Sequence, residues 1–261
     1  MTILKHELKE GRISLLIWAA AISFLLGVCI LIYPEMEKQM GEISAMFADM
    51  GGFSQAFGMD RVNFGEFSGF FAVECGNVLG LGGALFAALL GISAFAKEEK
   101  EHTAEFLLSH PVSRTAVAAG KLGAILVQLF LLTLASMLVT LLCMVMIRET
   151  IPFSTLALLF SSYFFMQLET ATITFGISAF LRRGGMGIGL GLAALFYFVN
   201  LLSNLLEETK FLKYFTPFGY AEGADILTEH SIPLNYFAVG MVFSLAGILL
   251  AFWQYRRKDI S

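Results

Sequence analysis

The sequence predicts an all-α membrane protein with six transmembrane helices, and three observations carry this prediction. Of the 261 residues, 57% are hydrophobic and 15% are charged, whereas a soluble domain carries about a quarter charged residues. The charges gather in short segments between long apolar ones. Six apolar segments each reach the length of about 18 residues that can cross a bilayer. They are residues 14–32, 71–95, 122–147, 155–181, 185–206 and 234–255.

The first span follows three basic residues, Lys5, Lys9 and Arg12, which is also the pattern of a secretory signal peptide. No small-residue cleavage site follows this span, because Tyr33 and Pro34 come next. The segment is also long for the apolar part of a signal peptide. We therefore expect it to be retained as a transmembrane helix.

The distribution of basic residues predicts the orientation of the spans. Six spans put both termini on one side, together with the connections at 96–121 and 182–184. This side carries 12 of the 17 lysines and arginines. Since basic residues gather in cytoplasmic loops, we expect a multi-pass protein of the cell membrane with cytoplasmic N and C termini.

The two large outer loops, residues 33–67 and 207–233, are acidic and rich in apolar residues. In the first loop, five apolar residues recur at spacings of three and four: Met36, Met40, Ile43, Phe47 and Met50. This spacing predicts an amphipathic helix. Such outer-loop helices lie at the outer interface, cap the mouth of a pathway, or pack on the span ends without touching substrate.

Two glycine motifs predict close helix packing, because small residues let helix backbones approach one another in lipid. Gly76 and Gly80 lie in the second span, and Gly187 and Gly191 lie in the fifth. The motif alone does not indicate whether the partner helix belongs to this chain or to another.

Glu169 is the acid in the middle of a span, in the segment FFMQLETATITF. A charge at that depth costs at least about 2.5 kcal/mol, so the side chain should face protein or water, or be protonated. One interpretation is that Glu169 and its neighbour Gln167 line a substrate cavity or a subunit interface. The other is a hydrogen bond between helices. Asn200 and Asn204 are weaker candidates for the same lining role.

Several kinds of chemistry have no supporting motif. The nearest approach to a phosphate-binding loop is Gly120-Lys121, which lacks the first glycine and the final serine or threonine. No zinc-protease or serine-hydrolase motif occurs, and the three cysteines form no close pair. We therefore expect no catalytic residues, no metal site and no cofactor in this chain.

The segment 96–121 is strongly charged and lies between the second and third spans. Its acidic residues come early, where a helix dipole favours them, and Pro111 ends the helical pattern. We expect a short helix along the inner surface, a turn at the proline, and entry into the third span. In an arbitrary membrane protein, this pattern would indicate a solvated connector.

The residues of this segment, KEEKEHTAEFLLSHPVSRTAVAAGKL, resemble the cytoplasmic loop of the type-2 permeases of ATP-binding-cassette (ABC) exporters. That loop typically reads E-x-x-x-G-T-x-E-x-L-L-x-x-P-V-S-R, followed by a lysine. The matching residues are Glu98, Thr103, Glu105, Leu107, Leu108, Pro111, Val112, Ser113, Arg114 and Lys121. His102 replaces the usual glycine. The opening LKHELKEGRISLLIWA is similar to the family's N-terminal interfacial helix, and the layout agrees over the whole chain.

The resemblance implies that residues 1–261 form one permease domain whose loop is a coupling helix. This helix would dock into a separate ABC ATPase subunit, which binds ATP and Mg. The contact residues implied are Glu98, Glu99, Thr103, Glu105, Phe106, Leu107, Leu108, Pro111 and Arg114. The family also implies two copies of the ATPase, a second permease chain that is the same or different, and no contact with nucleic acid.

The favoured function is therefore export of an amphipathic substrate, such as a peptide, a drug or a lipid-like molecule, driven by ATP hydrolysis in the partner. A second hypothesis is a regulatory or sensory membrane protein that docks a partner through the same loop without transport. A third, an intramembrane enzyme, is disfavoured by the absence of catalytic motifs.

Overall fold

The computed structural model describes residues 2–39, 50–100, 113–181 and 185–257, and in this part of the chain the regular elements are all helical. Six helical segments are long and apolar enough to cross a membrane, as the sequence predicts. They are Ile3–Glu37, Phe67–Phe95, Arg114–Ile147, Phe153–Ser178, Met186–Leu205 and Leu234–Arg257.

Five of the spans are single helices, and the second is composite. The single helices are α1 (Thr2–Glu37), α7 (Arg114–Ile147), α8 (Phe153–Ser178), α9 (Met186–Leu205) and α11 (Leu234–Arg257). The second span consists of α4 (Phe67–Cys75), the π-helical turns of η1 (Gly76–Leu81) and α5 (Gly82–Lys100). The sequence pattern did not predict this π-helical segment.

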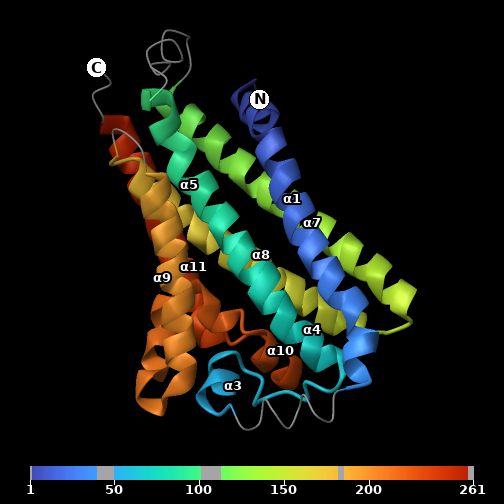
Figure 1. Cartoon of the computed structure of the whole chain (residues 1–261). Helices are drawn as coiled ribbons and strands as arrows, with labels where there is room; N and C mark the ends of the chain where they lie inside the picture. The colour runs from blue at the N-terminus through green and yellow to red at the C-terminus, as the bar shows by residue number, and fades with distance from the viewer. Residues whose placement is uncertain (1, 40–49, 101–112, 182–184, 258–261) are drawn as a thin grey trace.

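The helices form a central pair with two helices on either side (Figure 1). The second span and α8 are central, because 61% of the residues in their most apolar stretches are buried, against 22–28% for the other four spans. Helices α1 and α7 pack together on one side, and α9 and α11 lie on the other. Helix α1 begins and α11 ends at the same end of the bundle, as six spans require.

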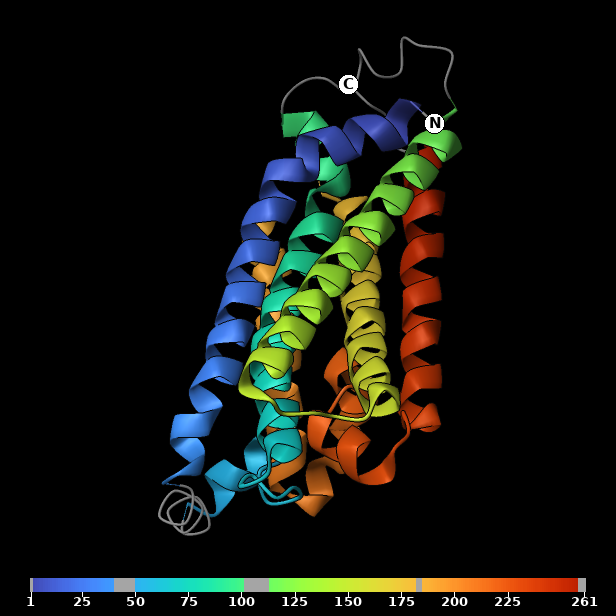
Figure 2. The same cartoon turned by 90° about the vertical axis from the view of Figure 1, so that its right-hand side faces the viewer.

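The predicted N-terminal interfacial helix is the first part of α1 and is continuous with the span. Figure 2 shows these first turns lying at an angle to the rest of α1, across the start of α7. The buried Lys121 of α7 donates to Glu7 at 2.7 Å. A Cβ at Gly120 would lie 2.9 Å from Ile3, so the glycine permits this approach.

A cap closes the opposite end of the bundle, which is the outer end in the predicted orientation. The cap comprises residues 50–66 and 206–233, with the short helices α3 (Gly52–Ala56), η2 (Glu207–Phe215), η3 (Pro217–Tyr220) and α10 (Gly223–Glu229). Of the five residues in the amphipathic pattern predicted for this end, Met36 belongs to α1 and Met50 lies in the turn before α3. Residues 40–49 lie outside the described residues.

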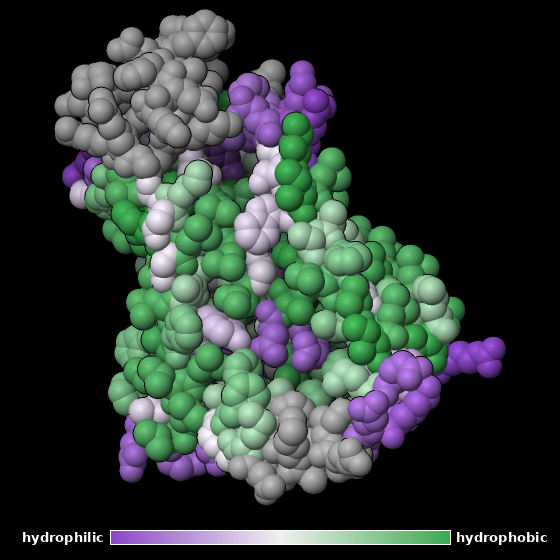
Figure 3. All heavy atoms as spheres, viewed as in Figure 1, coloured by the Kyte–Doolittle hydropathy of each residue, from purple (hydrophilic) through white to green (hydrophobic). Residues whose placement is uncertain are grey.

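The outward faces of the peripheral helices are apolar, as a lipid-facing surface must be. Large hydrophobic side chains are more than half exposed on each of them, among them Phe24 of α1, Leu142 of α7, Phe198 of α9 and Leu249 of α11. Figure 3 shows hydrophobic residues over most of one face. Hydrophilic residues lie mainly towards its two ends, with one small patch between them.

Candidate functional site

Helices α8 and α11 approach each other closely at the edge of the candidate site. A Cβ at Gly176 of α8 would lie 2.8 Å from the carbonyl oxygen of Gly247 in α11, and a Cβ at Gly247 would overlap the carbonyl oxygen of Thr172. Only glycine fits at both positions. Next to this contact, the Thr172 hydroxyl lies 3.1 Å from that of Ser244 and links the two helices.

A hollow, which we call the α8–α11 groove, lies beside this contact and has a volume of about 550 Å³. Its walls come from α8, the two residues Phe180 and Leu181 that follow it, α11, one residue of α9 and one residue of η2. The lining residues are Glu169, Ile173, Gly176, Ile177, Phe180, Leu181, Phe196, Phe215, Phe243, Ala246, Gly247 and Leu250. Glu169 is the only ionisable residue among them.

Glu169 is 2% exposed and accepts a hydrogen bond of 2.8 Å from the hydroxyl of Tyr220. Burial raises the pKa of the Tyr220 phenol, and the neighbouring carboxylate raises it further. The phenol therefore stays protonated and remains a donor. Gly240 of α11 makes room for the carboxylate, since a Cβ there would overlap one of its oxygens.

The contacts of Glu169 bear on both sequence interpretations, and a role in lining a substrate path stays a prediction. The carboxylate makes a hydrogen bond, although its partner belongs to the cap rather than to another span. The same side chain also lines the groove. Glu169 is thus a polar residue where the cap meets the otherwise apolar α8–α11 groove.

Gln167 lies elsewhere, on the side of α8 that faces the second span. Its side chain fills the space that a Cβ at Gly83 would need, and its amide nitrogen donates to the carbonyl oxygen of Leu79 at 3.4 Å. It does not line the groove. Its position indicates a packing role between α5 and α8.

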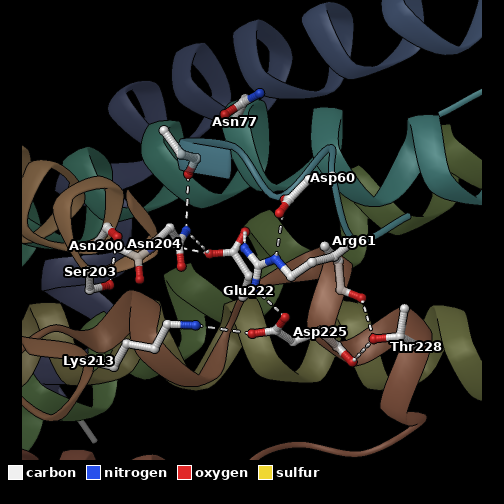
Figure 4. Close-up of polar contacts among 12 residues, drawn as sticks. Asp60, Arg61, Asn77, Asn200, Ser203, Asn204, Lys213, Glu222, Asp225 and Thr228 are labelled. Atoms are coloured by element: carbon white, nitrogen blue, oxygen red, sulfur yellow. Dashed lines mark hydrogen bonds and ion pairs between the residues drawn. The ribbon is translucent and has the colours of Figure 1, made fainter. Parts of the chain in front are cut away.

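Asn200 and Asn204 come together at a third place, the end of α9 next to the cap (Figure 4). Both amide nitrogens donate to the same carboxylate oxygen of Glu222, at 3.0 and 2.9 Å. Asn204 also donates to the carbonyl oxygen of Ala56 at 3.0 Å. These two residues therefore anchor the cap to α9.

Glu222 belongs to a cluster of charges that ties the two parts of the cap together. Arg61, from the first outer loop, makes an ion pair with Asp225 of α10 and lies 3.9 Å from Glu222. Lys213 of η2 is 8% exposed and donates to the other oxygen of Asp225 at 3.2 Å. Asp225 thus holds two basic residues from the two separate parts of the cap.

We expect Asp225→Asn to destabilise the cap, because the buried ammonium of Lys213 and the guanidinium of Arg61 would lose their common carboxylate. Removing one partner of a largely buried pair costs several kcal/mol, and partial exposure reduces this cost to about 2 kcal/mol. The measurement is the thermal unfolding midpoint in detergent. Glu229→Gln, an exposed position on the same helix, is the control. Equal midpoints for the two variants would contradict the assigned role of Asp225.

The two predicted glycine motifs have different environments. Gly76 and Gly80 face Tyr163 of α8, which is 3.2 Å and 3.5 Å from the Cβ positions. Gly187 and Gly191 have no other atoms within 4 Å of theirs. Instead, α9 contacts the second span through Gly189. The first motif therefore has its partner within this chain, whereas the described residues supply no partner for the second.

The predicted coupling segment is described only at its two ends. Glu98 and Glu99 belong to the last turns of α5, whereas Thr103, Glu105, Phe106, Leu107, Leu108 and Pro111 lie outside the described residues. Arg114 begins α7, and Ser113 caps this helix by accepting from the amide of Ala116. The Arg114 side chain donates to the carbonyl oxygens of Tyr255 and Arg256 at 3.4 Å. The start of α7 is thus joined to the end of α11.

Sequence reasoning missed Tyr220, Glu222 and the charge cluster around Asp225. One signal was available. Arg61 and Lys213 are two of the few basic residues on the predicted outer side, and both turn out to be paired with acids. Glu74 of α4 was also missed, and it is half-buried beside Cys29, whose sulfur lies 3.8 Å away.

A family model described as "ABC-2 family transporter protein" matches residues 1–260. A comparison with curated proteins finds no match. The family match covers nearly the whole chain, and it agrees with the six spanning helices and with the resemblance noted in the loop. The chain therefore belongs to the ABC-2 family of transporter proteins.

Proposed function

We propose that this chain is the permease of an ATP-driven exporter and that it moves an amphipathic substrate through the α8–α11 groove. The groove is the observation that supports this proposal most strongly. It combines a volume of about 550 Å³, within the range of about 300–1,000 Å³ usual for small-molecule sites, with apolar walls and one carboxylate. An amphipathic peptide, drug or lipid-like molecule suits such a lining.

Energy would come from a separate ABC ATPase that binds ATP and Mg and holds the segment 96–121. The described ends of this segment support the coupling route. Its first end is the last turn of α5, which packs along α8, and its second end is tied through Arg114 to α11. A force on the segment would therefore reach both helices that form the groove.

The complex would contain two ATPase subunits and two permease chains, which are either identical or different. The open face of α9 at Gly187 and Gly191 is suited to close approach by another helix. In this arrangement the termini and the segment 96–121 face the cytoplasm, and the cap faces outwards across the cell membrane.

The proposal is tested by purifying the complex of this chain with its ATPase and reconstituting it in sealed vesicles. We expect ATP to drive accumulation of a fluorescent amphipathic dye in vesicles whose ATPase subunits face outwards, and the dye to stimulate hydrolysis. A complex that hydrolyses ATP without dye stimulation or transport, over a panel of charged and neutral dyes, would favour a regulatory or sensory role instead.

A further inference from the structure

Resting on the proposed function, we propose that the substrate is an amphipathic cation and that Glu169 receives its positively charged group in the α8–α11 groove. Within the described residues Glu169 makes no ion pair, and its one side-chain hydrogen bond comes from the neutral phenol of Tyr220. A buried carboxylate without a counter-charge is costly in a membrane. A bound cation would supply the missing charge.

The other walls of the groove suit such a molecule. Four phenylalanines line it: Phe180, Phe196, Phe215 and Phe243. Aromatic rings attract organic cations, most strongly where water is excluded, and they also accommodate hydrocarbon. Along α8 the groove extends from Glu169 to Ile177 and beyond, about 12 Å at 1.5 Å per residue. This is close to the depth of one leaflet, about 15 Å, so a hydrocarbon chain fits beside the charged group.

The hydrogen bond from Tyr220 suggests how binding is communicated to the cap. Tyr220 stands two residues before Glu222, which holds Asn200 and Asn204 of α9. A cation at Glu169 competes with the phenol for the carboxylate. Occupation of the groove would therefore weaken a contact between the cap and α8.

Equilibrium binding tests the proposal directly. The intact complex is placed in nanodiscs of zwitterionic phospholipid, and two radiolabelled probes are compared, dodecyltrimethylammonium and its uncharged isostere 2,2-dimethyltetradecane. Binding to empty nanodiscs is subtracted. We expect the complex to bind the cation at least about tenfold more tightly than the neutral probe, which corresponds to about 1.4 kcal/mol.

Three variants separate charge recognition from a structural role. Glu169→Gln can still accept from Tyr220 but carries no charge, so it should lose most of the preference, and Glu169→Asp should keep most of it. Glu74→Gln removes a different acid from a spanning helix and should leave the preference unchanged. Size-exclusion profiles show whether each variant is folded.

Equal binding of the two probes to the wild-type complex would overturn the proposal, as would an unchanged preference in folded Glu169→Gln. Tight binding of the neutral probe alone would identify the groove as a site for an uncharged lipid chain. No binding of either probe would indicate that a helix of another chain fills it. Charge-selective binding without ATP-driven transport would refute the proposed function and leave the cation site standing.

Discussion

Leu108→Asp is expected to reduce substrate-stimulated ATP hydrolysis by at least about tenfold while the chain still inserts and folds. Leu108 lies in the segment whose residues resemble the coupling helix of ABC-2 permeases, where apolar side chains would enter a cleft of the ATPase. A buried apolar anchor at an interface is commonly worth about 2 kcal/mol or more, and a carboxylate in its place adds a cost of desolvation.

Glu105→Arg should act in the same direction, since it reverses a charge that would face basic or polar groups of the ATPase. Hydrolysis and retention of the ATPase on the tagged permease are measured together for each variant. Glu101→Arg makes the same charge change at a position outside the family pattern and serves as the control. If both variants hydrolyse ATP with wild-type coupling, the segment 96–121 is not the coupling element.

Gly91→Leu is expected to have the largest effect on stability. A Cβ at Gly91 of α5 would overlap the carbonyl oxygen of Ala171 and the hydroxyl of Thr174, both on α8. Backbone atoms cannot rotate away, so the two central helices must separate. Overpacking a core costs about 1–3 kcal/mol and occasionally more, and here we expect about 3 kcal/mol.

The matched control is Gly191→Leu, because the Cβ position of Gly191 in α9 meets no other atoms within 4 Å. Thermal unfolding of the two purified permeases is followed by fluorescence-detected size exclusion. We expect the Gly91 variant to lose on the order of 10 °C and the Gly191 variant to keep the wild-type midpoint. Similar losses in both would contradict the packing of α5 on α8. If a second permease packs at Gly191, that variant should instead weaken permease association.

Much of the fold could be predicted from the sequence because a bilayer imposes a simple rule. Each span must be a long apolar helix that satisfies its own backbone, so length and hydropathy predict all six. The helices extend beyond the apolar spans at their polar ends. Helix α1 begins at Thr2, whereas the predicted apolar span begins at residue 14, because the predicted N-terminal helix is continuous with the span.

The site was harder to predict, because its contacts join residues far apart in the sequence. Arg61 and Asp225 are separated by 164 positions, and Glu169 and Tyr220 by 51. Hydropathy singled out Glu169 as an unusual acid, but no local pattern could name its partner. Gln167 illustrates the same limit. It lies only two residues before Glu169 in α8, but its side chain packs against Gly83 of α5 and does not line the groove.

The glycine motifs show a similar division between pattern and placement. The spacing predicted close helix packing equally for Gly76 and Gly80 and for Gly187 and Gly191. In the structure, the first pair packs against Tyr163 and the second faces open space. Which face of a helix turns inwards depends on the whole bundle, so the motif predicts close packing without naming the partner.

Purification of the tagged chain from its native membrane in mild detergent, followed by mass spectrometry, tests the central claim most directly. We predict that an ABC ATPase with a phosphate-binding loop co-purifies in a stoichiometric amount, at one ATPase per permease chain. Recovery of any second six-span chain would distinguish a heterodimer from a homodimer. Recovery of this chain alone, repeated after crosslinking in the membrane, would contradict its role as the permease of an ATP-driven exporter.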